Sequence, residues 1–232
     1  MAIQPAVLNI MTDARPQAGP SDSAPQHGAH EHGAAQICAA LHADVTVDRV
    51  QRVVTATMTN PAGAPPVDVI VSAGNAAGRR PQRLRVGPGA NKRFVQTPTG
   101  PDGDYSFSIT APGGFYRAFS GLVIPAGMNA LAVATASAVP GPDGVRVRLE
   151  NPGGQPVTMT VTSYTVAGGV EIVLLPAMHA TCLDMPLAAD GSYDLMITTN
   201  NSTRLSYRYA GMINRQDRGD PSPVYLDVIA GW

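Results

Sequence analysis

Four short stretches decide the fold, because they form two copies of one pattern. Gly103–Thr110 (GDYSFSIT) is followed by Phe115–Gly121 (FYRAFSG), and Gly191–Thr198 (GSYDLMIT) is followed by Leu205–Gly211 (LSYRYAG). In each copy, large apolar residues alternate with small or polar ones, which places the apolar side chains on one face of a strand. Short turns rich in Gly, Pro or Asn separate the paired stretches. Each copy therefore predicts a β-hairpin with one apolar face.

The apolar positions of both hairpins are expected to pack against a second sheet. In the last stretch Leu205 shares its face with two tyrosines, whereas Ser206 and Arg208 lie on the opposite face. The predicted structural residues are Tyr105, Phe107, Phe115, Phe119, Gly121, Tyr193, Leu195, Tyr207, Tyr209 and Gly211.

The repeat extends beyond the hairpins. Tyr105 and Tyr193 are 88 residues apart, and the turns that begin at Asn60-Pro61 and Asn151-Pro152 are 91 apart. Short strands between Gly/Pro turns, in units of about 90 residues, are typical of small antiparallel sandwiches. We predict an all-β chain with two tandem immunoglobulin-like β-sandwich domains behind a flexible arm. The predicted parts are the arm 1–35, the first repeat 36–123 and the second repeat 124–232.

Composition excludes some classes of partner. The 232 residues carry a net charge of −1, and charged residues make up 14% of the chain, which gives no general attraction to nucleic acid. Twenty-four glycines and 21 prolines leave little room for long helices. No apolar run approaches the roughly 18 residues that a transmembrane helix needs.

The first 35 residues have the composition of a flexible arm, because Asp13–Pro25 is rich in Pro, Gly and Ser and lacks periodicity. The mildly apolar start, Met1–Met11, has no basic region and does not resemble a signal peptide. The chain is therefore expected to stay in the cytoplasm, to leave with a partner, or to have lost its leader. The sequence does not choose among these alternatives.

The two cysteines are predicted to be free thiols. A repeat spacing of 88 residues places Cys182 at the position of Phe94, which indicates a small buried hydrophobic residue rather than half of a disulfide. The other cysteine is Cys38, in the segment just after the arm.

The hairpins and the Asn-Pro turns resemble the duplicated C-terminal domain of bacterial phospholipases C, the haemolytic and non-haemolytic phosphatidylcholine-type enzymes. Tyr193–Leu195 and Tyr209–Gly211 match its second copy, Phe115–Gly121 matches its first, and Gly219–Pro221 matches its tail. The resemblance covers residues 37 to 222. The chain departs from the family at Ser192, where the family has Trp, and at Met212-Ile213-Asn214, where it has His-Val-Glu. The family's large catalytic domain has no counterpart here, so the resemblance implies an accessory module without catalytic activity or cofactor.

No arrangement of residues indicates an enzyme. His-Glu-x-x-His, Gly-x-Ser-x-Gly and phosphate-binding Gly loops are absent, and neither His42 nor His179 has a carboxylate partner suggested by spacing. His27, His30 and His32 have a spacing that can bind a metal ion, but tracts of this kind usually bind metals without a specific role. We expect no specific metal site.

A basic stretch is the best candidate for a binding surface. Arg83 and Arg85 alternate with apolar residues and should share the outer face of a strand, where guanidinium groups suit phosphate. The same pattern also describes a solvated strand that resists aggregation. We call the following set the basic face: Arg79, Arg80, Arg83, Arg85, Lys92 and Arg93.

Three functions are compatible with these patterns. The favoured one is a non-catalytic accessory module that binds a separate phosphoesterase-type catalytic subunit or an anionic lipid surface. The alternative is a self-assembling structural subunit whose N-terminal arm clasps a neighbouring copy. A glycan-binding sandwich is supported by the fold class alone.

Overall fold

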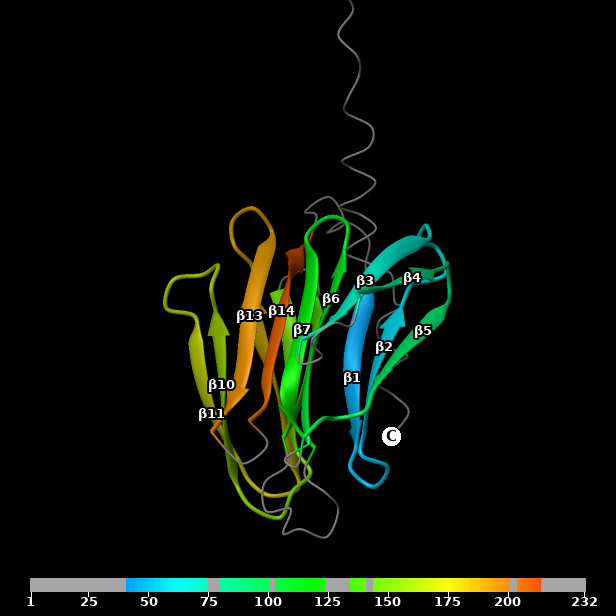
Figure 1. Ribbon diagram of the computed structural model, residues 1–232. Helices are drawn as coiled ribbons and strands as arrows, with labels where there is room; N and C mark the ends of the chain where they lie inside the picture. Colours follow the sequence, from blue (N-terminus) through cyan, green and yellow to red (C-terminus); the bar gives the residue numbers. More distant parts are fainter. Residues whose placement is uncertain are drawn as a thin grey trace, which may run out of the picture.

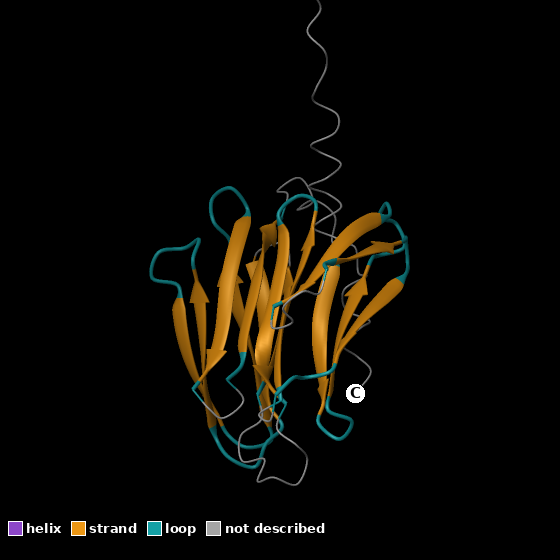
Figure 2. Cartoon of the chain, viewed as in Figure 1, coloured by secondary structure: helices purple, strands orange, loops and turns teal. Residues whose placement is uncertain are grey.

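The computed structural model describes residues 41–74, 80–100, 103–123, 134–140, 144–200 and 204–213. Every regular element in these residues is a β-strand (Figure 2), so the predicted all-β class is confirmed. Within the described ranges there is no helix long and apolar enough to cross a bilayer. The predicted N-terminal arm, Cys38 and the three histidines at 27, 30 and 32 lie outside them.

In the part of the chain that the structure describes, each repeat contributes seven strands. Those of the first are β1 (His42–Asp48), β2 (Val53–Thr59), β3 (Val67–Ala73), β4 (Gln82–Val86), β5 (Asn91–Gln96), β6 (Asp104–Ala111) and β7 (Phe115–Leu122). Those of the second are β8 (Thr135–Pro140), β9 (Gly144–Asn151), β10 (Val157–Ser163), β11 (Val170–Leu175), β12 (His179–Pro186), β13 (Ser192–Thr199) and β14 (Ser206–Met212).

The strands follow the same order in both repeats. Three of them form a small antiparallel sheet, β1-β2-β5 in the first repeat and β8-β9-β12 in the second. The other four run β4-β3-β6-β7 and β11-β10-β13-β14. Each repeat is thus a sandwich of one three-stranded and one four-stranded layer.

The two four-stranded layers form one continuous sheet. Strand β14 pairs antiparallel with β7, with Tyr207 opposite Phe119 and Ala210 opposite Tyr116, which gives the order β11-β10-β13-β14-β7-β6-β3-β4. Figure 1 shows β13, β14 and β7 side by side near its centre. Strands β1 and β8 also approach each other. The repeats are therefore joined by backbone hydrogen bonds at the middle of the large sheet, which the sequence pattern did not predict.

The alternation of the hairpins is confirmed by burial. The side chains at alternate positions of β6, β7, β13 and β14 are buried in the core, and those between them are partly exposed on the outer face. Aromatic rings connect the repeats, because Phe119 packs 5.1 Å from Tyr207 and 5.7 Å from Tyr209 between ring centroids. The same inward row carries Gly121 and Gly211.

The two glycines hold equivalent positions that only a hydrogen side chain fits. A Cβ at Gly121 would lie 2.7 Å from the hydroxyl of Tyr105, and one at Gly211 would lie 2.7 Å from that of Tyr193. Each glycine is the direct cross-strand partner of its tyrosine. The phenol rings therefore lie across the glycines, which lets the hydroxyl groups reach the junction of the repeats.

The Asn-Pro turns owe their shape to two buried asparagines. Asn60 donates to the carbonyl oxygens of Pro65 and Val86. Asn151 donates to those of Gln155, Leu175 and Pro176. Both amides tie the end of one sheet to the other sheet of the same repeat. The spacing of 91 residues thus marks structurally equivalent positions.

The prediction that Cys182 is buried is wrong, because the structure exposes it. Leu183 pairs with buried Val147 and packs against the core, as Phe94 does opposite Ala56. The equivalent of Phe94 is therefore Leu183, at a spacing of 89 rather than 88. A slip of one residue along a strand moves a side chain to the other face.

Candidate functional site

The basic face lies along one edge of the first repeat. Arg83 and Arg85 stand opposite Ile70 and Asp68 on the outer face of β4, the last strand of the large sheet, and both are exposed. Val86, at the end of the same strand, is buried. The alternation of β4 thus directs its arginines to solvent.

The remaining members lie close to this strand. Lys92 and Arg93 are exposed on β5, the edge strand of the small sheet, and β5 lies next to β4. Arg80 is exposed just before β4, whereas Arg79 lies outside the described residues. Five of the six cations therefore lie on or next to the neighbouring edge strands β4 and β5, with Arg83 and Arg85 on the outer face of the large sheet and Arg93 on the outer face of the small sheet.

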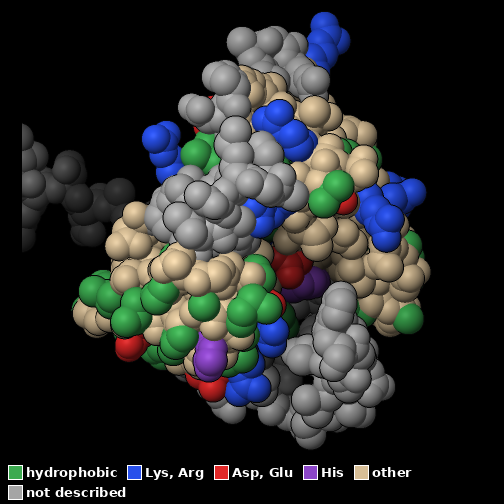
Figure 3. All heavy atoms as spheres, turned by 90° about the horizontal axis from the view of Figure 1, so that it is seen from below, with side chains coloured by type: hydrophobic (Ala, Val, Ile, Leu, Met, Phe, Trp, Pro, Cys, Tyr) green, Lys and Arg blue, Asp and Glu red, His purple; other side chains and the backbone are tan. Residues whose placement is uncertain are grey.

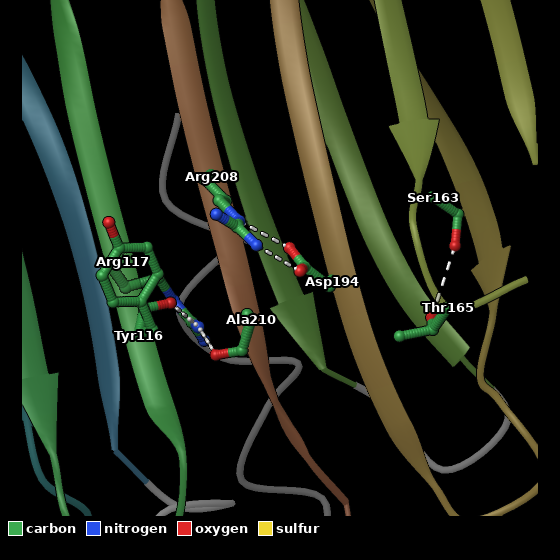
Figure 4. Close-up of polar contacts among 7 residues, drawn as sticks. All are labelled: Tyr116, Arg117, Ser163, Thr165, Asp194, Arg208 and Ala210. Carbon is green, nitrogen blue, oxygen red and sulfur yellow. Dashed lines mark hydrogen bonds and ion pairs between the residues drawn. The ribbon is translucent and has the colours of Figure 1, made fainter.

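A second cluster of polar side chains lies at the junction of the repeats, around Arg117 of β7. This side chain is completely buried. Its guanidinium donates to the carbonyl oxygens of Tyr116 at 2.9 Å and Ala210 at 2.8 Å, and to the hydroxyl of Tyr193 at 2.8 Å. Figure 4 shows it reaching from β7 towards Ala210 of β14. The ring of Phe115 lies 4.2 Å below the guanidinium carbon.

Buried tyrosines complete this junction cluster. The hydroxyls of Tyr105 and Tyr207, one from each repeat, are 2.7 Å apart, and Tyr209 donates to the carbonyl of Ala136 on β8. Burial raises the pKa of Tyr105 to about 12 and raises the pKa values of Tyr207 and Tyr209 as well. These phenols stay neutral and act as hydrogen-bonding groups, so the cluster holds the repeats together rather than activating a nucleophile.

His42 and Asp44 of β1 border the junction cluster. Burial, with a smaller contribution from the positive charge of Arg117, lowers the pKa of His42 to about 4. Burial raises the pKa of Asp44 to about 6, although a backbone hydrogen bond from Val45 and the charge of Arg117 oppose the rise. Figure 3 shows acidic and histidine side chains together in a hollow at the middle of the face that it views.

Because the pKa of His42 is lowered and that of Asp44 is raised, replacing one or the other should change the stability at acid pH in opposite directions. Wild-type His42 resists protonation in the fold, so its contribution to stability is lost as pH falls from about 6.5 towards 4. His42→Gln should therefore lose less stability than wild type between pH 7 and pH 4, by about 3 kcal/mol. The free energy of unfolding in urea, measured across this pH range, checks this expectation.

Asp44→Asn is the matched control with the opposite sign. The raised pKa of Asp44 means that the folded chain gains stability as pH falls from about 6 towards 3.8. The asparagine variant lacks that gain and should lose more stability on acidification than wild type. Equal pH dependence in wild type and both variants would contradict the burial of these two groups beside Arg117.

Sequence analysis missed the junction cluster, although one signal was present. Arg117 occupies the inward series of β7 together with Phe115 and Phe119, so its spacing alone predicts a buried guanidinium. Nothing local indicated two of its three acceptors, because Tyr193 and Ala210 lie in the other repeat. Asp44, two residues from His42 on the same strand, was also overlooked.

The outer face of the large sheet carries a different arginine. Arg208 of β14 makes a bidentate ion pair with Asp194 of β13, with N···O distances of 2.8 and 2.6 Å (Figure 4). The rings of Tyr116 and Tyr164 each lie 5.7 Å from its guanidinium carbon. The carboxylate of Asp194 therefore neutralises the charge of Arg208, and the hydrogen bonds to Asp194 raise the pKa of Arg208.

No three His, Cys, Asp or Glu side chains in the described part of the chain gather in a way that could hold a metal ion.

A family model matches the first repeat. The family model "Bacterial phospholipase C, C-terminal domain" matches residues 34–122, up to the last residue of β7. The resemblance seen in the sequence is confirmed for this part of the chain. No curated protein matches the sequence.

Among solved structures, the crystal structure of red sea bream transglutaminase is similar to 75% of this chain, with 10% sequence identity and a TM-score of 0.28. The chain spans 31% of the length of that protein. A similarity this low says nothing about activity.

Proposed function

We propose that this chain is a non-catalytic accessory module that docks on an anionic lipid surface through the basic face of its first repeat. The family match supports the accessory role, because it is to a C-terminal domain of enzymes that act on phospholipids. It covers the strands that carry the basic face, from β1 to β7.

The proposal rests on one difference between the repeats: the exposed arginines of the second repeat have acidic partners, and most of the basic-face cations that the structure describes do not. The exposed Arg146 and Arg148 of β9 are paired with Asp184 at 2.8 Å and Glu150 at 3.3 Å. In the described residues, Arg83 makes no ion pair, and Arg85 has a distant one with Asp68 at 3.8 Å.

The same contrast holds for the rest of the basic face. Arg80, Lys92 and Arg93 also make no ion pair within the described ranges. A cation near an anionic membrane contributes about 1 kcal/mol, so five of them suffice for reversible binding. Guanidinium groups add bidentate hydrogen bonds to phosphate.

Binding to vesicles tests this proposal. The full chain should co-sediment with vesicles that contain phosphatidylglycerol and not with pure phosphatidylcholine vesicles, and added salt should weaken binding. Arg83→Gln combined with Arg85→Gln should weaken the partition about 30-fold, since two cations are lost.

The matched control replaces Arg146 and Arg148 with glutamine, which removes two exposed arginines that already have partners. This variant should bind vesicles as wild type does. Equal loss in both double variants would show that binding follows total charge rather than the basic face. If vesicles do not bind and native mass spectrometry finds a larger phosphoesterase-type companion, the module docks on a catalytic subunit instead.

A further inference from the structure

More than half of the large exposed apolar side chains of the described residues lie at the end of the large sheet opposite the basic face. Five of the nine large ones lie in one segment around strand β11, and Ile172 and Leu174 are 70% and 68% exposed. Strand β11 is the last strand of the sheet, and in the described residues it pairs only with β10. The five are Tyr164, Val170, Ile172, Leu174 and Met178.

The register of β11 shows that three of these side chains form a row. Val170, Ile172 and Leu174 stand opposite Thr162, Thr160 and Thr158 on the outer face of the sheet. Leu175 is buried on the inner side, and Val173 packs against the core. The outer row therefore contributes nothing to the core of its own chain, and it leaves an apolar strand edge open.

The other end of the sheet is built differently at equivalent positions. Val67 pairs with Val86 in the first repeat as Val157 pairs with Leu175 in the second. It follows that Arg85 and Arg83 of β4 take the places of Leu174 and Ile172. Arginines directly opposite each other would repel, so the β4 edge cannot pair with its own copy, whereas the outer row of β11 carries no charge.

We propose that β11 pairs antiparallel with β11 of a second copy of this chain, about a two-fold axis at Ile172. On the outer face, Ile172 of one chain then meets Ile172 of the other, and Val170 meets Leu174. On the inner face, Glu171 meets Val173, so no like charges are opposed. Branched aliphatic side chains make favourable cross-strand pairs.

This contact repeats a mode of joining that the chain already uses, since β7 and β14 connect the two repeats edge to edge. An isologous contact between identical edges is closed. Because β4, the other edge of the large sheet, carries arginines, the large sheet is extended only at β11. The inference goes beyond the proposed lipid binding and leaves the basic faces free at the two ends of the dimer.

Sedimentation velocity of the full chain over a range of concentrations tests the proposal. A monomer–dimer equilibrium is expected, with a dissociation constant on the order of micromolar, since a single six-residue strand makes a small interface. Ile172→Lys and Ile172→Glu should each be monomeric, because like charges then meet at the axis. An equimolar mixture of the two should form dimers again.

Val95→Lys is the control, because Val95 is an exposed valine on the outer face of the edge strand β5 of the small sheet. This variant should dimerise as wild type does. A wild-type chain that stays monomeric at the highest concentration, or a dimer that survives Ile172→Lys, would overturn the proposal. Failure of the mixture to dimerise would overturn the two-fold register at Ile172.

Discussion

Replacing Arg117 with alanine is expected to lower the free energy of unfolding by about 3–5 kcal/mol. The substitution takes the donor from the buried hydroxyl of Tyr193 and from the partly buried carbonyl oxygens of Tyr116 and Ala210, at about 1–3 kcal/mol for each poorly solvated group. It also removes the packing of the guanidinium on Phe115 and leaves a cavity beside it. Relief from burying a charge acts in the other direction, but the existing hydrogen bonds already offset much of that cost.

Arg208→Ala is the matched control for this experiment. Arg208 lies on the strand paired with β7, next to Arg117 in register, but on the exposed face, where its side chain is 41% accessible. Its loss should cost less than about 1 kcal/mol, as for other surface ion pairs. Urea denaturation of the two variants compares them directly. Equal effects would contradict the structural role assigned to Arg117.

The second large effect is expected at Phe119, the ring that joins the aromatic cores of the repeats. It is almost completely buried and contacts Phe107 in its own repeat as well as Tyr207 and Tyr209 in the other. Phe119→Ala should cost about 3–5 kcal/mol in the free energy of unfolding. Phe94→Ala should cost less, because this half-buried ring lies at the edge of the same row.

A double-mutant cycle shows whether this contact couples the repeats. The loss of unfolding free energy in the double variant Phe119→Ala/Tyr209→Ala should be about 1 kcal/mol smaller than the sum of the losses in the two single variants. Either single variant already removes the edge-to-face contact between the two rings. Phe94→Ala and Tyr209→Ala should be additive. All variants should unfold in a single transition, which is shifted relative to that of wild type. Two separate transitions would mean that the repeats unfold independently despite the shared sheet.

The parts of the fold that depend on local sequence could be predicted from it. Alternation places Tyr105, Phe107 and Ile109 in the core and directs Arg83 and Arg85 to solvent, because a strand has a period of two residues. The Asn-Pro turns mark the repeat because a buried amide is needed at Asn60 and at Asn151 alike.

The remaining features depend on contacts between distant segments. No local pattern records that β7 pairs with β14, since edge strands of two sandwiches can equally face solvent. The burial of Arg117 among groups of the second repeat depends on that pairing. The error at Cys182 has a simpler cause. The spacing between equivalent residues is 88 at Tyr105 and Tyr193 but 89 at Phe94 and Leu183. A shift of one residue along a strand moves the side chain to the other face.

Hydrogen–deuterium exchange of the full chain with and without phosphatidylglycerol vesicles tests the proposed function most directly, because it locates the bound surface. We expect slower exchange in β4 and β5, where the basic face lies, and unchanged exchange in β9 and β12, where the exposed arginines are already paired. Protection of β9 and β12 to the same extent, or no protection in β4 and β5 when the chain is vesicle-bound, would contradict the proposed function.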